Sequence, residues 1–374
     1  MITCGLNLKC LLIKKIQKKR VFMEVIYFNK IFNNTQNSYK YYWWLSITEI
    51  CFQKDQREIS YDEIIFKIIS KLWYPVNYFK LSFGKIDQCS KYIKQIKENY
   101  KLEDNISEQD LYKFLLKHKN SDYLIKITSE LTRYVPYRFI RPWYSNQTRG
   151  MKDGIVNSSI LELQDESSPY KIDMPSKSII LNKDWFNWIK TNFKLIESFT
   201  FFELIKYLER VNPNSTNLSK KLVRPKTRNL TKSTKYWKNY ILNNPNEIDI
   251  FEKKPLIEIQ DLSIDHFLPW SFVAHDLIWN LHPTNKNINS SKNNCIPDKS
   301  YFNRFYKLQY SFCRFLLNNN ENKTLESYYT FFNCSKTELD SLRLEQFIIK
   351  MEKFYSPQYE IAKNMGFDYN WRLN

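Results

Sequence analysis

The chain has 374 residues, 43% of them hydrophobic and 17% aromatic, so we expect an ordered core in one large domain or two smaller ones. Its five glycines form neither a G-x-G-x-x-G nor a G-x-x-x-x-G-K motif, which excludes the dinucleotide-binding and P-loop folds. The formal net charge of +18 indicates a polyanionic partner, nucleic acid first, although an AT-rich genome would also enrich lysine. The sequence has no run of about 18 apolar residues, so we expect no membrane span.

The first residues and the cysteines indicate the compartment. Residues 1–22 place an apolar stretch before a basic cluster, the reverse of a secretory signal, and Met23 opens a more ordinary beginning. We therefore interpret residues 1–22 as a doubtful N-terminal extension. The seven cysteines are scattered and form no C-x-x-C pair, so we expect no structural zinc, and reduced thiols in a cytoplasmic protein.

Two segments before residue 211 have the spacing of a capping box, which marks the first turn of a helix. Ser60 and Glu63 precede an amphipathic pattern, and this predicts a helix that Pro75 ends. Thr200 and Glu203 repeat the spacing, and this predicts a second helix that starts at that point.

Further amphipathic patterns predict helices near both ends of the chain. One covers residues 107–118, and two more cover residues 301–317 and 337–355. We therefore predict a helical N-terminal domain over residues 23–210 and a helical C-terminal region over residues 301–374.

Residues 133–150 interleave arginines with aromatic residues. Such mixing suits phosphate contacts combined with base stacking. It equally suits arginines that pack on aromatic faces inside a domain. Arg138 and Arg141 are the candidate nucleic-acid contacts of this segment.

Residues 211–250 are strongly basic, with no acidic residue between Glu209 and Glu247. Prolines, asparagines and serines interrupt regular structure there, so we predict a linker. A solvated linker with no ligand is one interpretation, and a linker that lies along a phosphate backbone is the one we prefer because of the segment that follows. Its candidate phosphate contacts are Lys220, Lys221, Arg224, Lys226 and Arg228.

Three of the four histidines in the chain fall between residues 266 and 282. Around them, residues 257–270 predict a strand, residues 278–284 a second strand, and residues 287–294 a short helix. Strand, strand and helix in this order form a ββα arrangement that can surround one metal ion. Asp265 and His266 stand side by side near the end of the first strand, which Pro269 ends. The strand need not continue through the pair, so we expect both residues where the backbone leaves the sheet.

Phosphodiester hydrolysis explains why these polar residues are needed. His266 suits a general base, because imidazole titrates near neutral pH. Asp265 and Asn289 offer the hard oxygen ligands that Mg²⁺ or Mn²⁺ prefers. Asn280 can brace the connecting loop, and Lys292, one helical turn beyond Asn289, can reach a phosphate.

The segment "IDHFLPWSF…WNL…N…NSSK…IP" resembles the HNH endonuclease motif of CRISPR RNA-guided nucleases and of stand-alone bacterial HNH proteins. The resemblance implies that His266 is the general base, that Asp265 and Asn289 are metal ligands, and that Asn280 orders the loop around the base. It implies an HNH domain over residues 251–300. The predicted fold class is therefore mainly α with a small α+β insert, the ββα-metal module, between helical regions.

The predicted function is metal-dependent cleavage of DNA, in restriction or anti-phage defence. An RNA-cleaving effector or toxin uses the same chemistry, and an inactive nucleic-acid-binding protein is a further alternative. Besides nucleic acid, a second copy of the chain or a defence-system protein is a candidate partner. His282 replaces the apolar residue usual at its position, and we expect a half-exposed strand residue there, as we expect His275 at the surface.

Overall fold

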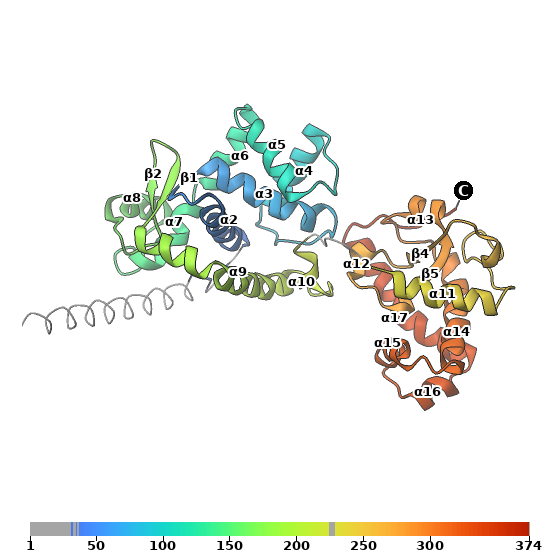
Figure 1. Ribbon diagram of the computed structural model, residues 1–374. Coiled ribbons are helices and arrows are strands. Elements are labelled where there is room, and N and C mark those ends of the chain that lie inside the picture. The colour runs from blue at the N-terminus through green and yellow to red at the C-terminus, as the bar shows by residue number, and fades with distance from the viewer. Residues whose placement is uncertain (1–30, 33–34, 36, 224–228, 374) are drawn as a thin grey trace, which may run out of the picture. The chain divides into compact units, whose positions relative to one another are not determined.

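The computed structural model describes residues 31–32, 35, 37–223 and 229–373 (Figure 1). The predicted extension over residues 1–22 lies outside the described residues, as do three candidate phosphate contacts, Arg224, Lys226 and Arg228. The described part is mainly helical with a few short strands, which confirms the predicted fold class. None of its helices is both long enough and apolar enough to cross a membrane.

The chain divides into two compact units. Unit 1 runs to Asn77 and resumes over Ser82–Pro213, and unit 2 combines Tyr78–Leu81 with Asn214–Asn374. The predicted HNH segment and the predicted C-terminal helices therefore belong to one unit. The two units are described separately below.

Unit 1 is a set of helices around the buried helix α2, with one small antiparallel sheet of strand order β1-β3-β2. Helix α2 has a run of buried aromatic side chains, and α9 packs along it. The sheet was not among the predicted elements, because its strands are only three or four residues long. The elements are α2 (Tyr39–Lys54), β1 (Glu58–Ser60), α3 (Tyr61–Asn77), α4 (Cys89–Tyr100), α5 (Glu108–Lys117), α6 (Asp122–Thr132), α7 (Val135–Ile140), η1 (Arg141–Tyr144), α8 (Asp153–Leu163), β2 (Tyr170–Asp173), β3 (Ser178–Leu181) and α9 (Lys183–Val211).

The two predicted capping boxes have different outcomes. The one before α3 is confirmed, since the Ser60 backbone N–H donates to Glu63 Oε2 (3.0 Å) and the Glu63 N–H donates to Ser60 Oγ (3.3 Å). The one at Thr200 is wrong, because Thr200 lies inside α9 and its hydroxyl donates to the Ile196 carbonyl (2.7 Å). A threonine that bonds back to residue i−4 is compatible with a helix interior, so the spacing alone does not mark a helix start. Pro75 also lies inside a helix, α3, rather than ending it.

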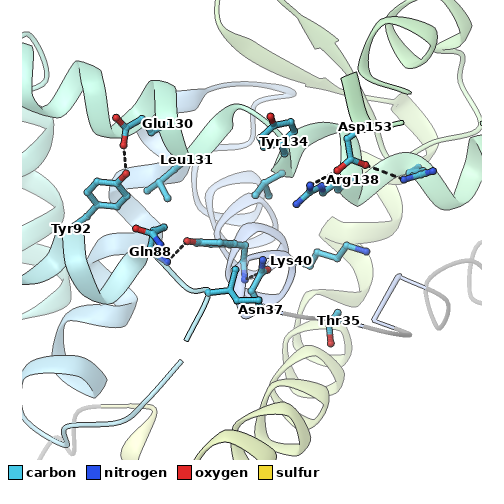
Figure 2. Close-up of a pocket in the computed structure, with 14 residues that line it drawn as sticks. Thr35, Asn37, Lys40, Gln88, Tyr92, Glu130, Leu131, Tyr134, Arg138 and Asp153 are labelled. Carbon is cyan, nitrogen blue, oxygen red and sulfur yellow. Dashed lines mark hydrogen bonds and ion pairs between the residues drawn. The ribbon is translucent and has the colours of Figure 1, made fainter. Parts of the chain in front are cut away.

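A cavity of about 530 Å³ opens in unit 1 between α2, α4, α6, α7 and α8 (Figure 2). Arg138 and Arg141, two candidate nucleic-acid contacts, line it, and both pair with Asp153. They therefore border a concave site that also includes Lys40.

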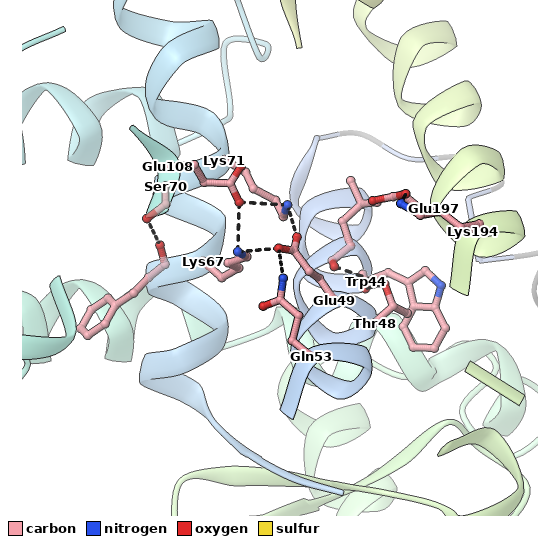
Figure 3. A network of polar contacts seen from close by, with 12 residues as sticks. Trp44, Thr48, Glu49, Gln53, Lys67, Ser70, Lys71, Glu108, Lys194 and Glu197 are labelled. Atoms are coloured by element: carbon pink, nitrogen blue, oxygen red, sulfur yellow. Dashed lines mark hydrogen bonds and ion pairs between the residues drawn. The ribbon is translucent and has the colours of Figure 1, made fainter. Parts of the chain in front are cut away.

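A nearly buried ion-pair network joins three helices of unit 1 (Figure 3). Lys67 of α3 lies 2.6 Å from Glu49 of α2 and 3.1 Å from Glu108 of α5, and Lys71 contacts the same two carboxylates. Burial raises the pKa of Glu49, but Lys71 and Lys67 outweigh that effect and hold it below its ordinary value. Such a network joins α2, α3 and α5, because each lysine of α3 contacts one carboxylate of α2 and one of α5.

Unit 2 contains the predicted hairpin and a set of helices that pack on it. Its elements are α10 (Leu218–Lys221), α11 (Thr231–Asn243), η2 (Leu256–Glu258), β4 (Leu262–His266), α12 (Trp270–Val273), η3 (Ile278–Asn280), β5 (Leu281–Asn285), α13 (Lys286–Lys292), η4 (Lys299–Tyr301), α14 (Phe302–Asn318), α15 (Asn322–Phe332), α16 (Lys336–Ser341) and α17 (Leu344–Asn364).

Part of the predicted basic linker is helix in unit 2. Helix α11 buries Trp237, Tyr240 and Ile241 at helical spacing, and the Trp237 ring stacks on Phe312 at 3.7 Å. In the sequence, lysines and asparagines stand between these apolar residues, so the basic composition of the segment conceals their helical spacing. Residues 231–243 are therefore an ordered helix of the unit rather than an irregular linker.

One aromatic core holds the hairpin against the C-terminal helices. Phe267, which follows β4, stacks on Phe305 of α14 with ring centroids 3.9 Å apart. Gln309 of α14 donates to the backbone carbonyl of Leu281 in β5 (2.6 Å), and Tyr328 of α15 donates to Gln309 in turn (2.5 Å). The C-terminal helices therefore fix both the position and the backbone of the hairpin.

Candidate active site

The two strands β4 and β5 form an antiparallel pair in which Asp265 lies opposite His282 and His266 opposite Leu281. The expectation that the backbone leaves the sheet at this pair is wrong, because both residues are paired within the ladder. The ladder continues past the pair, since the Phe267 N–H donates to the Asn280 carbonyl (2.8 Å). Successive side chains of a strand point to opposite faces. The carboxylate and the imidazole are therefore directed to the two sides of one short strand.

Helix α13 covers the carboxylate side of β4. Lys292 Nζ lies 3.2 Å from Asp265 Oδ2 and also donates to the His266 backbone carbonyl (3.0 Å). Asn289 donates its amide Nδ2 to Ser263 Oγ (2.9 Å), two residues before Asp265 on the same face. The predicted ligand pair, Asp265 and Asn289, is thus carried by two elements that pack directly on each other.

The electrostatic surroundings keep Asp265 ionised. Its side chain is only 5% exposed, and burial alone would raise its pKa. Lys292, His282 and His266 outweigh burial, so the pKa of Asp265 lies below its ordinary value. Although Lys292 is at ion-pair distance, Asp265 Oδ2 accepts no well-directed hydrogen bond among the described residues. This buried oxygen therefore retains a lone pair for another partner.

This donor set fits a hard divalent cation. The Asp265 carboxylate is anionic with an under-used oxygen, and Asn289 has its amide nitrogen engaged, so its carbonyl oxygen is the atom left to act as a ligand. Carboxylate and amide oxygens are the ligands that Mg²⁺ and Mn²⁺ prefer. The described residues contain no group of three or more His, Cys, Asp and Glu side chains that could hold a metal ion. A cation at this site would therefore rest on these two oxygen donors, with other ligands from water or substrate.

Asp276 occupies the imidazole side of β4, and the sequence analysis did not assign it a role. His266 Nε2 lies 2.8 Å from Asp276 Oδ1, within hydrogen-bond distance. The sequence contained a signal for this contact, because Asp276 is the one acidic residue between Asp265 and Asp298. Asp276 lies between α12 and η3, outside the strand and helix patterns that the sequence shows.

His275 and Lys220 lie near the same edge of the site. His275 is half-buried against the Trp279 ring (5.0 Å), so the expectation of a surface residue is only partly met. Burial lowers the pKa of His275 to about 4, with His266 and Lys220 adding to the shift and Asp276 opposing it. Lys220 itself is exposed, so it is a cation at the surface beside the imidazole side of the hairpin.

Asn280 connects the hairpin to the loop and to the C-terminal helices. Its Oδ1 accepts from the Leu268 N–H (3.0 Å), its Nδ2 donates to the Leu268 carbonyl (2.9 Å), and the Tyr355 hydroxyl lies 3.3 Å from Oδ1. All these groups are buried. The Asn280 side chain therefore holds the backbone just after His266, and a contribution to catalysis through this contact stays a prediction.

His282 differs from its expectation, because it is fully buried rather than half-exposed. Aromatic rings surround it, with the Phe251 centroid at 5.2 Å and that of Phe305 at 5.8 Å. Its Nε2 lies 3.5 Å from Asp265 Oδ2. His282 is thus a polar neighbour of the candidate ligand inside an aromatic enclosure.

Two candidate phosphate contacts of unit 2, Lys292 and Lys221, are fully buried, so neither lies at the surface where a phosphate backbone could contact it. Lys292 is held by Asp265 as described above. Lys221 donates to Ser215 Oγ (2.8 Å) and lies over the Phe272 ring (5.8 Å), and burial lowers its pKa to about 8. Both side chains help to build the unit rather than to meet a ligand.

The comparison with protein families agrees with this geometry. Residues 249–298 match the model of a family described as HNH endonuclease. Neither a search of curated proteins nor a search of solved structures found a match to the chain. The matched segment contains β4, β5 and α13, and with them Asp265, His266, Asp276, Asn280, His282, Asn289 and Lys292. The chain is therefore an HNH-domain protein, and unit 2 contains its HNH segment.

Proposed function

We propose that the protein is a metal-dependent endonuclease that hydrolyses phosphodiester bonds in DNA. One observation carries the proposal. In an HNH segment, one strand carries an ionised carboxylate and an imidazole at consecutive positions, with the Asn289 amide near the first and the Asp276 carboxylate in contact with the second.

The contacts suggest a role for each residue. When His266 donates its Nε2–H to Asp276, its Nδ1 is the unprotonated nitrogen, and this atom takes a proton from the attacking water. The Asp276 carboxylate then stabilises the imidazolium that forms. Asp265 and Asn289 would hold Mg²⁺ or Mn²⁺, which stabilises the negative charge that develops on the phosphate. Asn280 keeps the backbone after His266 in place.

Charge supports nucleic acid as the substrate. The net charge of +18 favours a polyanion, and the exposed Lys220 stands near the imidazole side of the hairpin. We propose DNA ahead of RNA, and a role in restriction or anti-phage defence. Comparing the cleavage of modified and unmodified DNA tests that role.

Plasmid cleavage tests the activity. We expect the wild-type protein to nick or cut plasmid DNA with Mg²⁺ or Mn²⁺ and to be inactive with EDTA. We expect His266→Ala to lower the rate roughly 10²- to 10⁴-fold, the usual contribution of a general base. A matched control is His118→Ala, because His118 lies in unit 1, where it is half-buried and contacts the Phe114 carbonyl and the rings of Tyr100 and Phe114. Equal rates for His266→Ala and wild type would refute the assigned base.

Structured RNA is the second substrate to assay. Cleavage of RNA alone would replace DNA as the substrate and leave the site intact. A wild-type protein that binds nucleic acid but cleaves neither substrate with either metal would favour an inactive binding protein.

A further inference from the structure

The cavity of unit 1 brings together three cationic side chains from separate elements. Lys40 of α2, Arg138 of α7 and Arg141 of η1 all line it (Figure 2). A smaller adjoining hollow is lined by the same three residues and by Arg149. Cations that converge from separate elements on a concave site are typical of an anion-binding site rather than of a solvated surface.

The acids near this cavity do not balance its positive charge. Arg138 and Arg141 share one carboxylate, Asp153. The Glu130 carboxylate is engaged by the Tyr92 hydroxyl on the far side of the cavity. Lys40 has no acidic partner within ion-pair distance in the described part of the chain.

Lys40 is instead held close to other cations. Its ammonium group donates to the Ile31 carbonyl (3.3 Å). Burial lowers the pKa of Lys40 to about 8, and Arg138 and Arg141 add to the shift. Three cations and two carboxylates, Asp153 and Glu130, line the cavity, so its lining carries a net positive charge that a bound anion would offset.

Another part of the cavity wall is apolar and aromatic, next to the polar side chains of Thr35, Asn37 and Gln88. Ile86 is 68% exposed, and Leu131, Val135 and Tyr134 line the same space. Flat rings pack well on such a surface, and aromatic side chains stack on nucleobases without sequence preference. The cavity therefore combines cationic side chains with an apolar surface on which a flat aromatic ring can pack. Its volume of about 530 Å³ lies in the range of ligand pockets, about 300–1,000 Å³.

We propose that this cavity binds a nucleotide through its phosphate monoester. Lys40, Arg138 and Arg141 contact the phosphate, and the base packs on the side of Tyr134 and Leu131. The ligand is a free nucleotide or the terminal nucleotide of a strand, which share this chemistry. The site is formed within unit 1, so it does not depend on the proposed nuclease activity of unit 2.

Binding to the full-length protein in EDTA tests the site, because cleavage is then suppressed. Titration calorimetry measures the affinity of the protein for dAMP and for inorganic phosphate. Fluorescence anisotropy compares its affinity for a 5′-phosphorylated oligonucleotide with that for the 5′-hydroxyl counterpart. The variants are Lys40→Gln, Arg141→Gln and Arg149→Gln. Lys194→Gln on α9 is the matched control, since its side chain is 81% exposed and does not line the cavity.

We expect Lys40→Gln and Arg141→Gln each to weaken binding roughly tenfold or more, the usual effect of losing a charged hydrogen bond. Arg149→Gln, an exposed substitution that spares the fold, should weaken binding less, and Lys194→Gln should leave it unchanged. A preference for dAMP identifies a free nucleotide, and a preference for the 5′-phosphorylated strand identifies a terminal one.

Three results would overturn the proposal: no binding by the wild type, equal binding by all variants, or equal affinity for inorganic phosphate and dAMP. Its failure is distinct from failure of the nuclease proposal. If the protein cleaves DNA but does not bind these ligands, only the proposal of a nucleotide site in the cavity is refuted. If the protein binds these ligands but cleaves no nucleic acid, only the proposal of nuclease activity is refuted.

Discussion

The contact between His266 and Asp276 gives the sharpest test of the active site. Asp276→Asn keeps the size of the side chain and removes its charge. The amide oxygen can still accept the Nε2–H of a neutral imidazole, but it no longer stabilises the imidazolium. We therefore expect kcat for DNA cleavage to fall while KM stays the same, because Asp276 acts through the base and not on the substrate.

The size of the effect follows from the geometry. At 2.8 Å the contact is a normal charged hydrogen bond, and such bonds contribute about 1.5–3 kcal/mol. The Asp276 side chain is 36% exposed, so solvent screens it and the lower end applies. A loss of about 1–1.5 kcal/mol corresponds to a roughly five- to twelvefold lower kcat.

Steady-state plasmid nicking with Mg²⁺ measures this change. Asp340→Asn is the matched control, because Asp340 is exposed and pairs with Arg314 among the C-terminal helices. Thermal unfolding of all three proteins checks that the fold is kept. A kcat for Asp276→Asn within twofold of wild type would refute the orienting role. A raised KM with unchanged kcat would show instead that Asp276 meets the substrate.

Three further predictions concern stability and are measured by urea unfolding. Asn280→Ala should destabilise unit 2 by about 3 kcal/mol, because both buried polar groups of Leu268 lose their partner. Lys292→Met should cost about 3–5 kcal/mol at pH 7, since it leaves the Asp265 carboxylate buried without its cation. As the pKa of Asp265 is lowered in the wild type, its stabilisation is present above the unfolded value of about 4 and is lost below it, so the Lys292→Met deficit should shrink at low pH. Ser60→Ala should cost about 1 kcal/mol through loss of the α3 cap, whereas the exposed Ser158→Ala should change little.

The sequence predicted the elements of the candidate site because local patterns encode them. Alternating apolar residues predict a strand over residues 257–270, and β4 (Leu262–His266) is a shorter strand inside that range, since residues 256–258 form η2. The polar "NINSSKNN" run predicts a helix over residues 287–294, and α13 (Lys286–Lys292) overlaps it closely. The Ser60 capping box is equally local, since both partners lie within one turn. Such features need no knowledge of the rest of the fold.

Burial could not be predicted in the same way, because it depends on distant parts of the chain. Lys292 and Lys221 have the charge of surface residues, and only the positions of Asp265 and Ser215 explain their burial. His282 is enclosed by rings from residues 251 and 305, far apart in sequence. The end of β4 was also misjudged, because the bond from Phe267 to Asn280 extends the ladder across the loop.

The stacking of Phe267 on Phe305 determines whether the HNH segment can keep its fold when it is moved into another protein. The family match ends at residue 298, before α14, α15 and α17 begin. Those helices provide the ring partners of the fully buried Phe267 and the hydroxyl that reaches Asn280. A transplanted 249–298 segment would expose these apolar rings to water and lose the brace after His266. The smallest piece that a gene fusion or recombination event can move intact is therefore the segment together with its C-terminal helices.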